Sequence, residues 1–289
     1  MALDPQKLRA KIESIGDLPT LPTVVTKIVG QLNNPSTNAA DIGKLIEQDP
    51  ALSGKVLRLV NSAYYGFPRQ IKSIQSAVVI LGFNKIRTTI MTASLFSSFR
   101  KGPAGFLNIN RFWQHSLGAA MGAKSAAETL GSVHLAEDAF IGGLLHDVGK
   151  IIMDQYQPAI FGPILKYAAD KGMLVTEVEN QVMNGFNHAA IGSWLVENWR
   201  LPKDIVRMVE GHHSPQRYNQ DRELVAFVHI GDILARAIGV GNGGDNRMPA
   251  LNSEIVANFQ LNEVFFEKSV TKLIREIEKA SEFFSMLTI

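Results

Sequence analysis

The spacing of apolar residues is the feature that most limits what this chain can fold into. In the segment PTVVTKIVGQL, Val25, Ile28 and Leu32 recur at intervals close to one helical turn. The same spacing continues along most of the chain. The stretch VVIL, residues 78–81, has strand propensity, but no neighbouring segment offers it a strand partner. We therefore predict helix there, and an all-α, multi-helix fold for the whole chain.

Turn and capping residues divide this pattern into separate helices. Ser36 and Asn38 are typical helix-start residues, Pro50 is a break, and Gly82 separates two helical halves. Beyond residue 110 the pattern predicts longer helices, at 111–130, 136–153, 158–171, 176–184, 188–199, 203–212, 221–239 and 262–286. The glycine-rich segment 239–249 is predicted to be a loop.

One segment is a candidate linker. Residues 100–110, RKGPAGFLNIN, combine Gly and Pro with a polar start. They predict a smaller N-terminal helical subdomain at 1–100 and a larger helical domain at 101–289. The pattern leaves open whether the N-terminal helices fold separately or pack against the rest.

Composition excludes several classes of protein. The net charge is +2, so the chain has no strong basic field and we do not expect a nucleic-acid partner. No segment approaches the roughly 18 apolar residues of a membrane span, and the start of the chain is no signal peptide, so we expect a cytoplasmic protein without a membrane partner. There is no cysteine, which excludes disulfides and thiolate metal sites.

The segment AFIGGLLHDVGKIIM, residues 139–153, places His146 and Asp147 side by side in an apolar context. On a helix, the large aliphatic residues form one stripe that faces a core, and the His-Asp pair projects away from it. Gly142 and Gly143 lie nearby and leave room for another helix or a ligand. Lys150 follows His146 by one turn. The pair alone is equally compatible with a solvated polar helix face.

Other residues favour a functional site. His115 precedes a stripe of small residues, which allows close helix contact, and His188 begins a helical segment. His212 and His213 lie at a helix end, where the macrodipole alone would also favour them. Asp232 lies in a mostly apolar helix, where a carboxylate is costly unless it is paired or bound to a metal. The two remaining histidines show no ligand pattern and are interpreted as structural: His134 and His229.

These residues carry a resemblance to a known family. The order His115, then HDVGK at 146–150, then Asp232 resembles the metal-binding pattern of the HD phosphohydrolase superfamily. The blocks LPTLP, QDPALSGKVLRLVNSAYYG and SIQSAVVILGF, together with HAAIGSWLVENWRLP and EGHHSP, are similar to HDOD domains, the HD-related output domains of bacterial signalling. The resemblance extends over about residues 15–235. It implies an HD-like helical bundle in a bacterial regulatory protein.

The resemblance also implies a ligand set. His188, His212 and His213 match the additional ligands of the two-metal HD-GYP branch, whereas many HDOD domains have lost their metal ligands. The chain departs from that branch in two ways: it has no Gly-Tyr-Pro segment after the two histidines, and Arg111 stands where some members place an acidic ligand. Hydrolysis of cyclic-di-GMP is therefore not implied.

The predicted site and function follow from these residues. Ligands that are His and carboxylate suit Fe, Mn, Zn, Ni or Co, with Asp147 as the natural bridge of a binuclear centre. Lys150 is expected to meet a phosphate as a point charge. Two hypotheses stay open. The favoured one is a signalling protein that acts through a protein partner and keeps its metal site; the other is a metal-dependent phosphohydrolase or phosphodiesterase acting on a nucleotide or another phosphoester.

Overall fold

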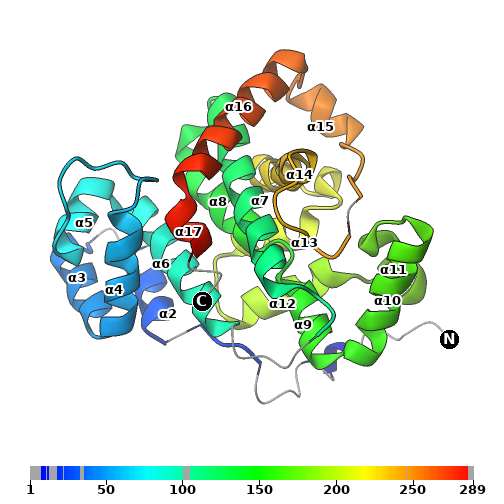
Figure 1. Ribbon diagram of the computed structural model, residues 1–289, viewed down its shortest axis with the longest axis horizontal. Helices are drawn as coiled ribbons and strands as arrows, with labels where there is room; N and C mark the ends of the chain where they lie inside the picture. The colour runs from blue at the N-terminus through cyan, green and yellow to red at the C-terminus, as the bar shows by residue number, and fades with distance from the viewer. Residues whose placement is uncertain are drawn as a thin grey trace. The chain divides into compact units, whose positions relative to one another are not determined.

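A computed structural model describes residues 8–10, 12, 18–21, 23–32, 36–99, 105–245 and 247–285. Figure 1 shows that these residues form helices joined by turns and loops, and no strand occurs among them. The prediction of an all-α fold is confirmed, and so is the helix across VVIL. The first part of the expected linker, residues 100–104, lies outside the described residues.

The chain divides into two compact units. Unit 1 comprises Met1–Leu18, Gly102–Asn198 and Pro202–Leu273, and unit 2 comprises Pro19–Lys101, Trp199–Leu201 and Ile274–Ile289. Both units draw on segments that are distant in the sequence. The expected division at residue 100 stays a prediction.

Unit 2 contains short helices whose ends follow local sequence signals. They are α2 (Thr23–Leu32), α3 (Ala39–Glu47), α4 (Pro50–Val60), α5 (Ile74–Leu81), α6 (Phe83–Ser98) and α17 (Ser281–Ser285). The Asn38 side chain accepts hydrogen bonds from two backbone N–H groups at the start of α3, which places the helix start at one of the two expected residues. Gly82, with φ of 80°, separates α5 from α6 as predicted.

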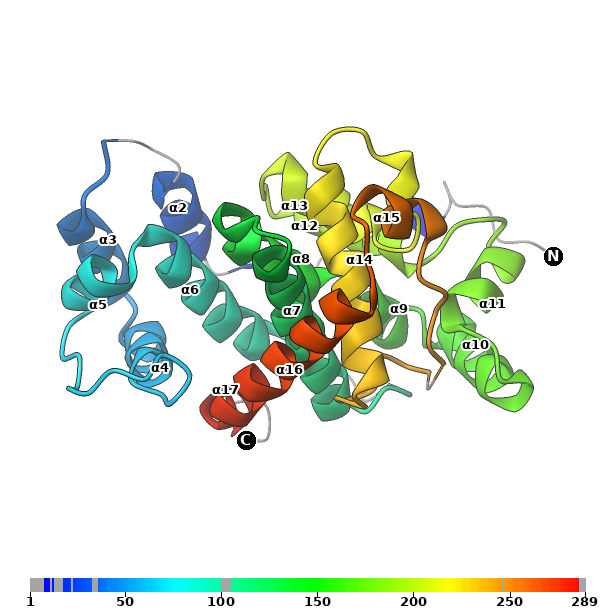
Figure 2. The same ribbon diagram turned by 90° about the horizontal axis from the view of Figure 1, so that it is seen from above.

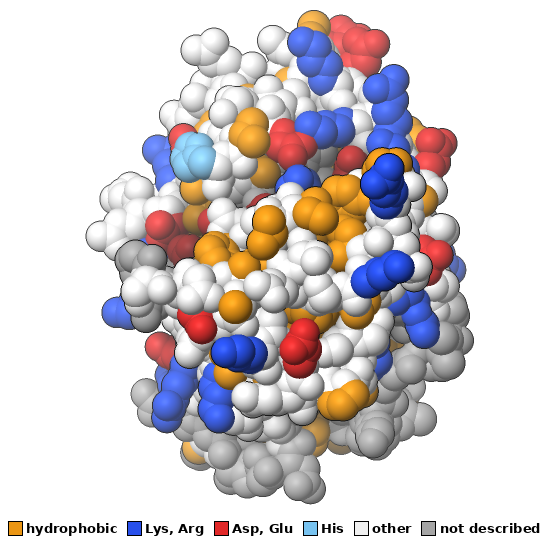
Figure 3. Space-filling view, turned by 90° about the vertical axis from the view of Figure 1, so that its left-hand side faces the viewer, with side chains coloured by type: hydrophobic (Ala, Val, Ile, Leu, Met, Phe, Trp, Pro, Cys, Tyr) orange, Lys and Arg blue, Asp and Glu red, His pale blue; other side chains and the backbone are white. Residues whose placement is uncertain are grey.

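Unit 2 also exposes apolar side chains. Val79 is 70% exposed and Ile80 is 54% exposed, both near the end of α5. Figure 3 faces the side of Figure 1 on which α3, α4 and α5 lie, and it shows hydrophobic side chains exposed between lysines and arginines. An exposed apolar surface of this kind is typical of an interaction site.

Unit 1 is built around three helices that lie side by side in Figures 1 and 2: α7 (Ile109–Thr129), α8 (Ala136–Leu145) and α14 (Arg222–Ala237). The other helices of the unit are α9 (Val148–Tyr156), α10 (Pro158–Lys171), α11 (Val175–Val182), α12 (His188–Asn198), α13 (Lys203–Gly211), α15 (Ser253–Asn258) and most of α16 (Glu263–Lys279), with 3₁₀ turns at Val133–Leu135 and Pro215–Arg217.

The small-residue stripes explain how α7, α8 and α14 come so close. A Cβ on Gly143 would lie 2.7 Å from the Cα of Ala120, and a Cβ on Gly231 would lie 2.5 Å from the carbonyl oxygen of Ala119. Only glycine permits these backbone contacts, so the predicted close approach is confirmed.

Two helix predictions were wrong, and one helix was missed. The expected helix 136–153 is broken at His146 and Asp147 into α8 and α9, and the expected helix 262–286 ends at Lys279 before the short α17. The helix α15 was not expected. It begins after Asn252, whose side chain accepts a hydrogen bond from the backbone N–H of Ile255, a start signal inside a segment otherwise rich in loop residues.

Among the described residues, no helix combines the length and the apolar character that spanning a bilayer requires.

Candidate metal centre

Unit 1 brings all seven predicted ligands together. His115 lies on α7, His146 and Asp147 form the turn between α8 and α9, His188 begins α12, and Asp232 lies on α14. The remaining two, His212 and His213, follow the end of α13. Six of the seven are buried and His213 is partly buried. The alternative of a solvated polar face is therefore wrong.

The break between α8 and α9 determines the direction in which the side chains of His146 and Asp147 point. Adjacent residues of an uninterrupted helix project about 100° apart. At the turn, the Nε2 atom of His146 lies 3.4 Å from the Oδ2 atom of Asp147, so both side chains face the same space. The sequence offers no Gly or Pro at the break, which explains why one continuous helix was expected.

Asp147 lies at the centre of the site. Its Oδ1 atom is 3.0 Å from Nε2 of His188 and 3.8 Å from Nε2 of His212, and its Oδ2 atom is 3.6 Å from Nε2 of His115. The donor atoms form two groups, each with its atoms within 4.8 Å of one another: Asp147, His188, His212 and His213, and His115, His146 and Asp147. Asp147 belongs to both groups, as expected of a bridging ligand.

Asp232 extends the second group. Its Oδ1 atom lies 3.1 Å from Nε2 of His115 and 3.7 Å from Nε2 of His146. The Arg236 guanidinium, one turn further along α14, donates to the same oxygen at 2.7 Å. The Asp232 carboxylate is thus held in place from outside the site.

Hydrogen bonds from the Nδ1 atoms fix the imidazole rings. The Nδ1 atom of His146 is 2.7 Å from the carbonyl oxygen of Gly143, and that of His212 is 2.7 Å from the carbonyl oxygen of Val209. A carbonyl only accepts, so each Nδ1 carries a proton, and each ring in its neutral form presents an Nε2 lone pair to the site. Metal-ligating histidines are typically oriented in this way.

Several donor atoms have no hydrogen-bond partner among the described residues. They are Nε2 of His115, His146 and His212 and Oδ1 of Asp147, all of them buried. Buried polar atoms are nearly always satisfied, so four such atoms that face one another need an explanation. A metal ion accepts lone pairs from these donor types, and the residues present therefore fit a metal.

The pKa values of most of these groups suit the same set of metal ligands. Burial raises the pKa of Asp147, but His146 and Lys150 outweigh it and hold that pKa well below its usual range. Burial also lowers the pKa of His146, while the neighbouring Asp147 carboxylate outweighs this effect and raises the pKa to about 9. Burial, reinforced by nearby imidazoles, holds the pKa values of His212 and His213 well below their usual range. The Asp147 carboxylate is thus ionised and the His212 and His213 rings are neutral, as ligands must be, whereas a metal ion would have to displace a proton from His146.

Lys150 is buried, and its Nζ atom donates to Oδ2 of Asp147 at 2.8 Å. It therefore faces the site, but as the partner of the central carboxylate. Its predicted contact with a phosphate stays a prediction.

Sequence reasoning missed two supporting carboxylates. Glu179 on α11 is buried, and its Oε2 atom accepts from Nδ1 of His188 at 2.5 Å. Asp245 accepts from Arg236 at 2.6 Å and from the backbone N–H of Val175 at 3.0 Å. In the sequence, each of them stands among polar residues and carries no signal of burial.

The histidines interpreted as structural do not join the site. His134 is exposed in a 3₁₀ turn. His229 is buried, its Nδ1 atom donates to the carbonyl oxygen of His212 at 2.8 Å, and its Nε2 atom accepts from the backbone N–H of Asn252 at 3.1 Å. Both ring nitrogens of His229 are satisfied, which leaves no lone pair for a metal.

The loop after α14 covers one side of the cluster. A Cβ on Gly243 would lie 2.8 Å from Oδ2 of Asp147 and 3.1 Å from Nε2 of His115, so only glycine allows the backbone to pass so near. A small pocket of about 210 Å³ lies between this loop and α7, and His115, Arg111 and Arg236 line it. The cluster is thus buried but adjoins a cavity.

Comparison with known proteins identifies the family to which this fold belongs. The HDOD domain family matches residues 18–215. The chain belongs to the HDOD family. An HDOD domain protein from Geobacter sulfurreducens, solved by crystallography, is 26% identical with a TM-score of 0.76, and the match covers 96% of this chain and 95% of that one.

Two further similar proteins extend the comparison. A Shewanella amazonensis protein, provisionally named a phosphohydrolase, has a TM-score of 0.73 at 21% identity over 96% of this chain and 98% of that one, which shows a shared fold. An uncharacterized protein from Treponema pallidum is 27% identical over 229 residues, which are 78% of this chain and 44% of that protein. The chain spans less than half the length of this curated relative.

Proposed function

We propose that this HDOD protein is a bacterial signalling regulator that holds two divalent metal ions in unit 1. The observation that carries the metal site is the convergence of five histidines and Asp232 on Asp147, with four buried donor atoms that lack a hydrogen-bond partner among the described residues. One ion would be held by Asp147, His188, His212 and His213, and the other by His115, His146, Asp147 and Asp232. Iron, manganese, zinc and nickel suit such a donor set.

Metal content of the purified protein tests this proposal. We expect Asp147→Asn to abolish retention of the metal, since it removes the shared carboxylate charge. His134→Gln is the matched control, because it removes an exposed imidazole outside the cluster. Circular dichroism checks that the first variant folds. Metal retained at the wild-type level by folded Asp147→Asn would refute the site.

A protein partner would complete the signalling role. The support is the exposed apolar surface at the end of α5, where Val79 and Ile80 reach solvent. We expect Val79→Glu combined with Ile80→Glu to abolish specific capture of the partner from the native host, while metal content stays unchanged. Equal capture by wild type and double variant would remove α5 from the interface. The expected cytoplasmic location stays a prediction.

The second candidate function is a metal-dependent phosphohydrolase. The observation that favours it is the small pocket that reaches His115, which offers a phosphoester access to the edge of the cluster. When bound, a divalent ion lowers the pKa of a coordinated water molecule and polarises a phosphoryl oxygen. Asp147 and the imidazoles would hold such an ion, Lys150 helps to keep Asp147 ionised, and the loop over the cluster would limit access of bulk water.

Turnover of a chromogenic phosphodiester separates the two candidates. If the protein is a hydrolase, manganese-loaded wild type releases nitrophenol from bis(p-nitrophenyl) phosphate, and Asp147→Asn does not. Absence of turnover in fully metal-loaded protein, across mono- and diesters, would leave the regulatory function alone.

A further inference from the structure

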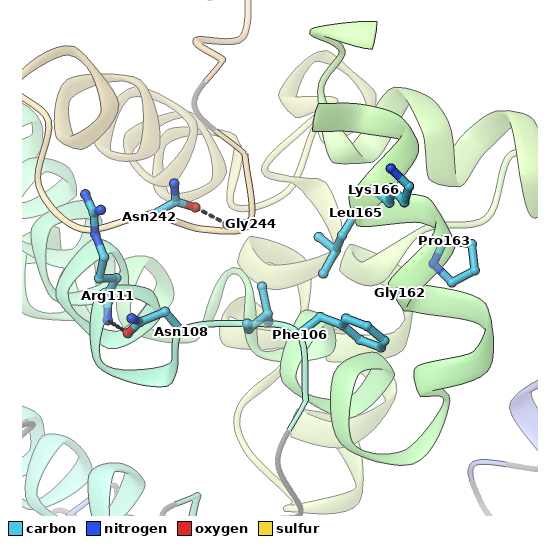
Figure 4. A pocket seen from close by; sticks show the side chains of 10 residues that line it. Phe106, Asn108, Arg111, Gly162, Pro163, Leu165, Lys166, Asn242 and Gly244 are labelled. Atoms are coloured by element: carbon cyan, nitrogen blue, oxygen red, sulfur yellow. Dashed lines mark hydrogen bonds between the residues drawn. The ribbon is translucent and has the colours of Figure 1, made fainter. Parts of the chain in front are cut away.

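A larger pocket lies next to the small one. It has a volume of about 780 Å³, within the range of small-molecule sites. Figure 4 shows its two sides: Asn108 and Arg111 come from the start of α7, and Leu165 and Lys166 come from α10. Asn242 and Gly244, from the loop that covers the cluster, close it above.

The charges in this pocket favour an anion. Its ten lining residues include Arg111 and Lys166 but no Asp or Glu. Lys166 forms an exposed ion pair with Asp170 at 2.9 Å, a contact worth little in water. Within the described part of the chain, no carboxylate pairs with the Arg111 guanidinium. Because a guanidinium binds phosphate in a bidentate manner, Arg111 is suited to hold a phosphate group.

An aromatic wall accompanies the charge. Phe106 is 65% exposed, although a large apolar side chain gains stability from burial. The backbone N–H of Phe106 donates to Oδ1 of buried Asp154 at 2.7 Å, which anchors the loop. A Cβ on Gly162 would lie 2.5 Å from the Phe106 ring, so the ring lies close against α10. The aromatic surface is thus positioned in advance, and exposed aromatic rings stack well on nucleobases.

The two pockets are connected through shared residues. Arg111 and Asn242 line both of them, and the smaller pocket ends at His115 of the metal cluster. The backbone N–H of Asn242 donates to the carbonyl oxygen of Arg111 at 2.8 Å, which ties the covering loop to α7 at this junction. A phosphate beside Arg111 would therefore lie on the path between the larger pocket and the cluster.

We propose that these pockets form a binding site for a nucleoside monophosphate, with Arg111 holding the phosphate and Phe106 stacking on the base. The inference rests on the proposed metal centre for its position, since it takes the cluster as the end of the binding site. It assigns a ligand class to this site and a role to Arg111, which stands where some members of the HD-GYP branch place an acidic ligand.

Calorimetric titration of the full chain with AMP tests this inference, with manganese-loaded and with EDTA-treated protein. We expect Arg111→Gln to weaken AMP binding about 10- to 100-fold, because a charge-assisted hydrogen bond is lost. Phe106→Ala should weaken it about tenfold through loss of stacking. Lys171→Gln is the matched control: it removes one positive charge at the end of α10, away from the pocket, and should leave affinity unchanged. Adenosine, which lacks the phosphate, should bind wild type as weakly as AMP binds Arg111→Gln.

The outcomes separate this inference from the proposed metal site. Metal-loaded protein that does not bind AMP, or binds it equally well with and without Arg111, would overturn the inference and leave the metal site intact. Binding of AMP that depends on Arg111 and Phe106 in EDTA would support the inference even if the purified protein holds no metal.

Discussion

The two units bury different kinds of polar side chain. In the described part of unit 2, the buried polar side chains are all hydroxyls: Ser62, Thr88, Thr89, Thr92 and Ser94. Those of Thr88, Thr89 and Thr92 donate to backbone carbonyls one turn earlier in α6. Unit 1 also buries serines, but in addition it buries ten ionisable side chains: His115, His146, Asp147, Lys150, Asp154, Glu179, His188, His212, His229 and Asp232.

This difference indicates that the two units have different roles. A buried ionisable group is costly unless it is paired, hydrogen-bonded or bound to a metal. Unit 1 carries most of that cost around Asp147, whereas the described part of unit 2 buries no ionisable side chain. We infer that unit 1 provides the metal site and that unit 2 provides a surface for a protein partner at the end of α5.

The largest effect is expected from a change that breaks the central ion pair of unit 1, between Lys150 and Asp147. Lys150→Met removes the ammonium that donates to Asp147 and leaves the buried carboxylate without this hydrogen-bonded partner. We expect the free energy of unfolding, measured by urea denaturation in EDTA, to fall by about 3–5 kcal/mol. The same change at exposed Lys171 is the control. A loss below about 1 kcal/mol for Lys150→Met would mean that the pair does not govern stability.

A metal ion should act on one unit only. At a concentration 100-fold above its dissociation constant, Mn²⁺ stabilises a protein that binds it by about 2.7 kcal/mol. We expect hydrogen exchange to slow in α7, α12 and α14 and to stay unchanged in α2 to α6. Slowing of the same size in both units, or in Asp147→Asn, would contradict a site confined to unit 1.

A smaller effect is expected from the carboxylate that orients His188. Glu179→Gln replaces the acceptor of the Nδ1 proton by a neutral amide. We expect metal affinity, measured by competition with a fluorescent chelator, to fall about 10- to 100-fold. Glu177→Gln, on the same helix but bonded only to the helix start, should leave affinity unchanged. Equal affinities for both variants would show that Glu179 is not needed.

The smallest effect is expected in unit 2. Thr92→Val removes a buried hydroxyl that donates to the carbonyl oxygen of Thr88 at 2.9 Å. The free energy of unfolding should fall by no more than about 1.5 kcal/mol, the net contribution of one neutral hydrogen bond. Metal content should stay at the wild-type value. A loss of metal in this variant would mean that the two units do not separate as proposed.

The sequence predicted the parts of this molecule that depend on local patterns. Apolar spacing located most helices, and Gly82 and Asn38 marked helix boundaries through their own backbone and side-chain chemistry. The candidate ligands could be selected because His and Asp in apolar helices need a reason to be there. Their convergence on Asp147 follows from close packing of helices that contain glycine.

What the sequence did not predict depends on contacts between distant segments. Glu179 and His188 meet across the turn between α11 and α12, and Asp245 meets Arg236 after a loop of mostly small residues. The break at His146 and Asp147 has no local signal, because neither residue is a helix breaker. Burial of the whole cluster likewise arises only when α7, α8, α9, α12 and α14 assemble.

Metal stoichiometry tests the central claim most directly. Titration of metal-stripped protein with Mn²⁺ should give two equivalents per chain for wild type and for His134→Gln. His213→Gln and His115→Gln should each lose one equivalent, because each belongs to only one donor group, and Asp147→Asn should lose both. Wild-type protein that binds no metal, or Asp147→Asn that still binds two equivalents, would contradict a centre bridged by Asp147.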